Sequence, residues 1–81
     1  MKERRPVDVN EVSPEAWRLL RVAAGYDQRD VERAVDGMRQ AHVSMLESGT
    51  RALSADRRKR LLELYTEELT DEQIEALIEH F

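Results

Sequence analysis

Apolar residues recur at steps of three and four along five short segments of the chain, and this spacing predicts an all-α fold. In the last segment Ile74, Leu77, Ile78 and Phe81 share one stripe, and acidic residues occupy the other sides. The predicted helices cover residues 14–24, 28–35, 38–48, 55–67 and 71–81, with the third starting between 38 and 40. A strand is conceivable only at residues 7–9. We therefore expect five short helices joined by short connections.

Residues that favour helix ends separate these segments. An oxygen-bearing N-cap residue precedes four of the helices, at Ser13, Asp27, Ser54 and Thr70. Pro14 suits the first position of a helix, and Thr70 with Gln73 has the spacing of a capping box. Gly25 and Gly49 follow the first and third helices, where glycine commonly stops a helix.

The length and composition exclude several classes of protein. A chain of 81 residues forms one domain with a small core, which dimerisation would extend. The absence of cysteine excludes disulfides, thiolate zinc sites and a cysteine nucleophile. His42 and His80 are far apart in the chain, no glycine loop suits a phosphate, and the acids are scattered. We therefore expect no enzyme, no metal or other cofactor and no small-molecule substrate.

No apolar run approaches the roughly 20 residues of a membrane span, and the first residues lack the apolar segment of a signal peptide. The expected location is the cytoplasm, with no membrane partner.

The net charge of −4 hides a strong asymmetry along the chain. Residues 28–60 carry eight basic and five acidic residues, whereas residues 61–81 carry seven acidic residues and no Lys or Arg. Eleven of the 13 basic residues are Arg, whose planar group suits phosphate and guanine. A GC-rich genome or a salt-adapted proteome explains this halophilic-like composition equally well. If the partner is a nucleic acid, binding in molar salt would have to depend on base contacts and apolar burial, which affinity measured from low to molar KCl would test.

The stretch QRDVERAVDGMRQAHVSMLESGTRAL, residues 28–53, places two short helices around a glycine turn. The order of elements, with Gln28, Val43, Leu46, Glu47 and Gly49, resembles the helix-turn-helix of the phage-repressor (Cro-like, XRE-type) family of DNA-binding regulators. The resemblance covers about residues 15–66. We therefore divide the chain into a flexible arm at 1–12, a compact helix-turn-helix domain over 13–69 and a C-terminal helix at 70–81, the expected dimerisation element.

Two features depart from the pattern of that family. The spacing from Gln28 to the third helix is one residue longer, and Glu32 stands where the family keeps a small alanine. Either Ala34 takes that role in a shifted register, or the angle between the helices differs.

An α-helix about 10–12 Å across fits the roughly 12 Å wide major groove of B-form DNA. Arg39 and Gln40 stand at the first turn of the third predicted helix, where N–H groups and the helix dipole favour base edges or phosphate. Arg can bind guanine and Gln can bind adenine, each contact contributing about 1–3 kcal/mol of discrimination. Ala41 offers its methyl group to thymine, and Ser44 and Met45 follow on the next turn. The candidate base-reading residues are therefore Arg39, Gln40, Ala41, Ser44 and Met45.

Further candidates would bind the phosphate backbone. By resemblance, Gln28 matches the second-helix glutamine that holds a phosphate, and Ser48, Thr50 and Arg51 match the loop that grips the backbone. Charge and position add His42, Arg57 and Arg58 to this set. Cations at the start of a helix interact unfavourably with its dipole. The four basic residues at 57–60 would therefore need a compensating interaction, such as contact with phosphates.

Each assignment has a plainer alternative. Arg39, Gln40 and the basic run at 57–60 are also compatible with a solvated surface, and Met45 with packing in the core or at a dimer surface. His42 fits a half-packed surface position. Glu47 is expected to be structural, bonding backbone or an Arg near the turn, because a carboxylate facing DNA would repel it. The bases at 2, 4 and 5 fit either an arm in a groove or a frayed terminus.

The last helix predicts a dimer. Its terminal stripe of Ile74, Leu77, Ile78 and Phe81 either meets its copy in a second subunit or folds onto Trp17 within the chain. Helix-turn-helix repressors read two half-sites about 34 Å apart through a two-fold dimer. We therefore predict a homodimer interface on this stripe, with the acidic residues turned away from DNA.

The function that these features predict is a sequence-specific, non-enzymatic transcriptional regulator of double-stranded DNA, most simply a repressor on a palindromic operator with helix 38–48 in the major groove. Two alternatives stay open. One is an antitoxin that represses its own operon while the acidic last helix blocks a toxin. The other is a protein-interaction adaptor that docks a partner through the last helix.

Overall fold

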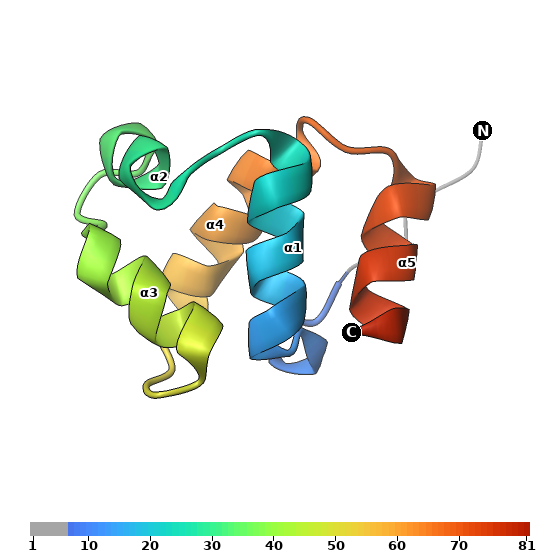
Figure 1. Cartoon of the computed structure of the whole chain (residues 1–81), viewed down its shortest axis with the longest axis horizontal. Coiled ribbons are helices and arrows are strands. Elements are labelled where there is room, and N and C mark those ends of the chain that lie inside the picture. Colours follow the sequence, from blue (N-terminus) through green and yellow to red (C-terminus); the bar gives the residue numbers. More distant parts are fainter. Residues whose placement is uncertain (1–6) are drawn as a thin grey trace.

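The computed structural model describes residues 7–81, and within that range it contains five α-helices and one 3-10 turn (Figure 1). In chain order these are η1 (Val9–Glu11), α1 (Pro14–Ala24), α2 (Gln28–Ala34), α3 (Gln40–Ser48), α4 (Ala55–Thr66) and α5 (Asp71–His80). The predicted all-α fold is confirmed. The strand considered at residues 7–9 is wrong, because the Asp8 carboxylate accepts a hydrogen bond from the Asn10 N–H and starts η1 instead.

The helix ends form where the capping residues predict them. The Ser13 hydroxyl accepts a hydrogen bond from the Ala16 N–H at 3.0 Å. Thr70 and Gln73 form the predicted reciprocal box, with bonds of 3.1 and 2.9 Å. Gly25 and Gly49 both adopt the left-handed conformation that stops a helix, with φ of 89° and 74°.

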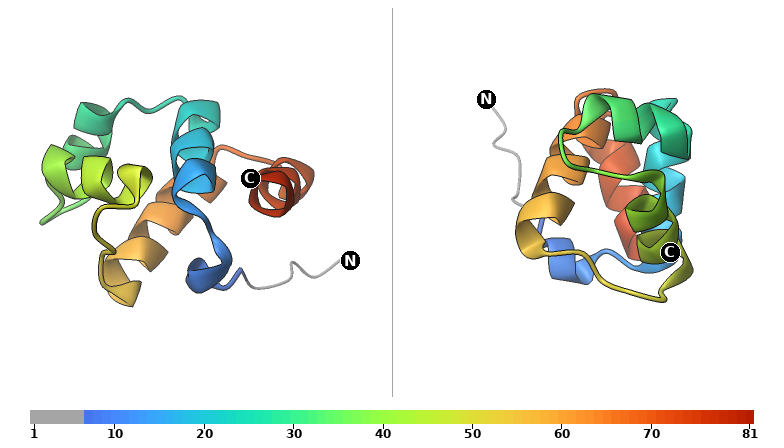
Figure 2. Two further views of the ribbon diagram at one scale, coloured as in Figure 1. Left: turned by 60° about the horizontal axis from the view of Figure 1, so that its bottom comes forward. Right: turned by 90° about the vertical axis from the view of Figure 1, so that its left-hand side faces the viewer.

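Helix α1 is the centre of the fold. It packs against α3, α4 and α5, and α3 and α5 lie on opposite sides of it (Figures 1 and 2). On α1, Trp17 and Leu20 are fully buried, and the Trp17 ring meets the buried Tyr65 ring of α4 edge-on with centroids 6.4 Å apart. The contact between Trp17 and Tyr65 joins α1 to α4 within the core.

The core begins earlier in the chain than the sequence predicted. Val9 and Val12 are both buried, because η1 packs against α4, so the described part of the expected arm at residues 1–12 belongs largely to the folded body. The basic positions 2, 4 and 5 of that arm lie outside the described residues.

The third helix also begins later than the earliest predicted start. Met38 is only 3% exposed and packs in the core before α3 begins. The prediction that the whole interval 38–48 enters the groove is therefore wrong for Met38, because its side chain is buried on the inner side.

Candidate nucleic-acid interface

Helix α3 presents an open outer face at one end of the molecule (Figure 1). Its inner face is held against α1 and α2 by Val43 and Leu46, which are buried. The five predicted base-reading residues all retain accessible surface: Arg39, Ala41 and Ser44 are exposed, and Gln40 and Met45 are half-buried. The fold therefore leaves this set available to a partner.

The first turn of α3 is capped by side chains of the chain itself. Arg39 is the N-cap residue, in extended conformation, and its backbone N–H donates to Nδ1 of His42 at 3.1 Å. The Gln40 N–H donates to Oε2 of Glu32, on α2, at 2.7 Å. Two backbone donors at this tip are thus already satisfied.

His42 has a different environment from that of a free phosphate ligand. Because Nδ1 accepts the Arg39 N–H, the proton of the neutral ring lies on Nε2. Nε2 lies 3.5 Å from the Arg57 guanidinium, and two donors facing each other make no hydrogen bond. His42 is therefore a capping residue of α3 whose outer nitrogen lies beside Arg57.

A surface hollow of about 470 Å³ opens between α3 and the start of α4. Its lining combines cationic, imidazole and apolar side chains: His42, Met45, Arg51, Ala52, Leu53, Ser54 and Arg57. Arg51 is exposed and Arg57 is half-buried, and neither makes an ion pair within residues 7–81. The hollow thus brings together three of the predicted phosphate-binding residues from three different segments.

Other predicted phosphate ligands are committed to neighbours in the chain. The Arg58 guanidinium donates to Oδ1 of Asn10 at 3.1 Å and so ties α4 to η1, although its buried Nε atom has no partner. The hydroxyls of Ser48, the last residue of α3, and Thr50, in the loop that follows, bond to each other at 2.7 Å on the exposed surface. The structure therefore does not bring Arg58 into the hollow with Arg57.

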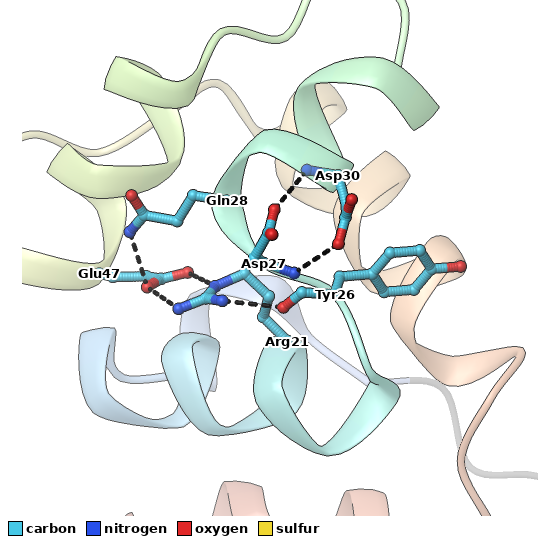
Figure 3. A network of polar contacts seen from close by, with 6 residues as sticks. All are labelled: Arg21, Tyr26, Asp27, Gln28, Asp30 and Glu47. Atoms are coloured by element: carbon cyan, nitrogen blue, oxygen red, sulfur yellow. Dashed lines mark hydrogen bonds and ion pairs between the residues drawn. The ribbon is translucent and has the colours of Figure 1, made fainter.

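The Gln28 side chain, predicted to hold a phosphate, also has a partner inside the fold. Its amide nitrogen donates to Oε1 of Glu47 at 3.2 Å, at the junction of α2 and α3, instead of facing outward (Figure 3). The side chain is half-buried, so one of its amide hydrogens serves the interior of the fold.

Glu47 is the centre of a buried polar network (Figure 3). Arg21 of α1 donates from Nε to Oε2 at 2.7 Å and from Nη2 to Oε1 at 3.1 Å, and a third bond of 2.8 Å runs from Nη1 to the Tyr26 carbonyl. The Arg21 and Glu47 side chains are 11% and 6% exposed. The bond to Glu47 raises the pKa of Arg21, against the opposing effect of burial. The predicted structural role of Glu47 is confirmed, and Arg21 is its partner.

The sequence did not reveal the structural roles of two residues near α3, Arg21 and Glu32. Sequence reasoning assigned no role to Arg21, although an Arg on the first helix was the natural partner for the structural acid it expected at Glu47. It treated Glu32 only as a packing anomaly, whereas the carboxylate caps α3. No spacing rule predicts that contact, which crosses the turn between α2 and α3.

The predicted dimer stripe is partly used inside the chain. Ile74 is 1% exposed, and Leu77 and Ile78 are half-buried against the core. Phe81 remains 56% exposed at the end of α5. Intramolecular packing therefore occupies Ile74, which leaves Leu77, Ile78 and Phe81 as the accessible part of the predicted interface.

Residues 7–81, which the structure describes, hold neither a metal cluster nor a membrane-spanning helix. Within this range no group of three or more His, Asp or Glu residues is arranged to hold a metal ion. None of its helices combines the length and apolar character needed to cross a membrane.

Comparison with protein families gives one match. Residues 6–58 match the model of a family described as a domain of unknown function (DUF8599), a range that contains η1, α1, α2, α3 and the start of α4. Neither the curated proteins nor the solved structures include a significant match to this chain.

Proposed function

We propose that this chain, which belongs to the DUF8599 family, is a sequence-specific regulator of transcription that inserts the outer face of α3 into the major groove of double-stranded DNA. The single observation that carries the proposal is the accessibility of this face beside a cationic hollow. The protein acts without enzymatic chemistry, in the cytoplasm, as a repressor that occupies its operator.

The side chains on α3 supply the chemistry of base recognition. Arg39 and Gln40 stand at the leading tip, with Ser44 one turn later. An Arg fork matches O6 and N7 of guanine, and a Gln amide matches N6 and N7 of adenine. Val43 and Leu46 keep the opposite side of α3 in the core, so the helix is held while its outer face reads the bases.

The hollow beside α3 suits the DNA backbone. Arg51 and Arg57 supply positive charge on its rim, and a phosphate there would lie next to the groove that α3 enters. His42 positions the tip of α3 through Nδ1, and its Nε2 lies beside Arg57 at the hollow.

The distribution of charge favours the same orientation. The outer side of α5 carries Glu72, Glu75 and Glu79, all exposed, and α5 lies across α1 from α3 (Figure 1). A duplex against α3 would therefore lie across α1 from this acidic helix, where distance and salt weaken the repulsion.

A homodimer completes the proposal, because a palindromic operator needs two copies of α3. Leu77, Ile78 and Phe81 are the apolar side chains that α5 still offers to a second subunit. Because Ile74 is buried in its own chain, the contact would extend the existing core at its edge.

Selection of bound sequences from a random duplex pool tests the proposal and yields the operator. On that operator, we expect Arg39→Ala and Gln40→Ala each to weaken binding by about 1–3 kcal/mol and to relax the preference at one base pair. Arg18→Ala, which removes the same charge from an exposed position on α1, is the control for Arg39→Ala. Equal affinities for Arg39→Ala and Arg18→Ala would remove α3 from the interface.

A further inference from the structure

The tip of α3 already holds an anion that comes from α2. The Glu32 carboxylate accepts the Gln40 N–H through Oε2 at 2.7 Å, across the turn that joins the two helices. Glu32 is exposed, and within residues 7–81 it makes no ion pair. Its negative charge is therefore not cancelled by a bonded cation.

This position is where a helix would otherwise attract an external anion. Free N–H groups and the positive end of the dipole favour phosphate at a helix N-terminus. At α3 the Arg39 N–H bonds to His42 and the Gln40 N–H bonds to Glu32, while the His42 and Val43 N–H groups bond to the Arg39 carbonyl. The tip that leads α3 therefore carries a fixed negative charge and few spare donors.

We infer that Glu32 is a specificity-determining residue: it repels the DNA backbone from the tip of α3, so that stable binding requires base contacts by Arg39 and Gln40. The inference rests on the proposed DNA-binding function. Without the Glu32 charge, a phosphate could approach the tip in any register along the duplex, and affinity would depend less on sequence.

Glu32→Gln separates the charge from the shape of the side chain. The amide oxygen of Gln can still accept the Gln40 N–H, so the cap is kept while the negative charge is removed. Glu32→Asp does the reverse, because it keeps the charge but draws the carboxylate back from α3. Glu75→Gln makes the same change of net charge on an exposed position of α5 and is the matched control.

The measurement is the dissociation constant for the selected operator and for a scrambled duplex of equal length, with each variant at the same salt. We expect Glu32→Gln to bind the scrambled duplex about fivefold more tightly than wild type, the size of one close charge repulsion in water. Binding to the operator should tighten less, so the ratio of the two affinities falls. Glu32→Asp should retain the weak scrambled binding of wild type, and Glu75→Gln should change both duplexes by the same small factor.

The outcomes separate the inference from the proposed function. If wild type discriminates between the duplexes and Glu32→Gln matches Glu75→Gln, the inference is overturned while DNA binding stands. If wild type binds neither duplex but Glu32→Gln binds both, the carboxylate blocks the tip altogether, and both the inference and the proposed function are overturned. If neither protein binds any duplex from low to molar KCl, both are overturned. A thermal melt of Glu32→Gln that overlays wild type excludes misfolding as the cause of altered binding.

Discussion

The carboxylate of Glu47 links three helices of the fold, α1, α2 and α3. It accepts two bonds from the Arg21 guanidinium and one from the Gln28 amide, in a site nearly closed to solvent. A buried charge pair adds little net stability over a well-packed apolar pair, but leaving one partner alone is costly. The pair therefore specifies how α3 sits on α1 more than it adds to the total stability.

Glu47→Ala should destabilise the fold by about 3–5 kcal/mol, because it leaves the Arg21 charge buried and unpaired. That is a large share of the roughly 4–12 kcal/mol expected for a domain of this size. Urea unfolding followed by circular dichroism measures the loss, with the exposed Glu63→Ala on α4 as control. The double variant Arg21→Met with Glu47→Leu should recover most of it. A loss below about 1 kcal/mol for Glu47→Ala would contradict a structural ion pair.

The cap of α2 gives the protein a specific response to acid. The hydrogen bond from the Asp30 N–H holds the pKa of the Asp27 carboxyl below its ordinary value of 3.8. A group whose pKa is lowered by folding contributes stability above its unfolded pKa and loses it as the pH falls through the folded one. Acid therefore removes this contribution below about pH 4.

Asp27→Asn keeps an oxygen acceptor at the cap and removes the titration. We expect its melting temperature near pH 7 to lie close to that of wild type. Between about pH 4 and about pH 2, the melting temperature of wild type should fall further than that of the variant. If the melting temperatures of the two proteins fall by the same amount over this interval, the Asp27 cap does not contribute to the pH dependence of stability.

At the scale of the element, the end of α3 is constrained more tightly than the end of α1. Gly49 and Gly25 both stop their helices with positive φ, but a Cβ on Gly49 would lie 3.3 Å from the Pro14 side chain, whereas one on Gly25 meets nothing within 4 Å. Gly49, at the C-terminus of α3, therefore lies close to Pro14 in the first turn of α1.

Gly25→Ala should therefore cost about 1–2 kcal/mol, from the left-handed conformation alone. Gly49→Ala should cost more, by up to about 1 kcal/mol, because Pro14 must move as well. Thermal melts compare the two directly, since about 1 kcal/mol shifts the midpoint by roughly 4–8 °C in a domain of this size. A larger loss for Gly25→Ala would show that the contact with Pro14 is easily relaxed.

The elements were predictable from local signals, and the polar contacts between them were not. Ser13, Asp27 and Thr70 cap within three residues of themselves, so the sequence alone reveals those helix starts. The bonds of Glu32 and Gln28 cross from α2 to α3, and their geometry depends on how the two helices pack. For the same reason the reading of Gln28 as a phosphate ligand could not anticipate Glu47.

At the scale of the whole molecule, the fold turns a gradient of charge along the chain into a separation in space. The basic middle of the sequence places Arg39 before α3, Arg51 after it and the cations at 57–60 at the start of α4. The acidic last third ends in α5, on the far side of α1 from α3 (Figures 1 and 2). Charge counting revealed the two regions but not their arrangement. The central position of α1 determines how the two charged regions are arranged, because α3 and α5 pack on different sides of it.

Chemical-shift mapping of the ¹⁵N-labelled protein titrated with its selected duplex tests the central claim most directly. If α3 reads the major groove, the largest shifts should fall on the amides of Arg39, Gln40, Ala41 and Ser44 and on the loop around Arg51. The amide resonances of α5 should shift little, apart from any shift caused by dimerisation. The spectrum of the free protein at matched concentration shows the size of that shift. Shifts concentrated on α5, with α3 unchanged, would contradict the account.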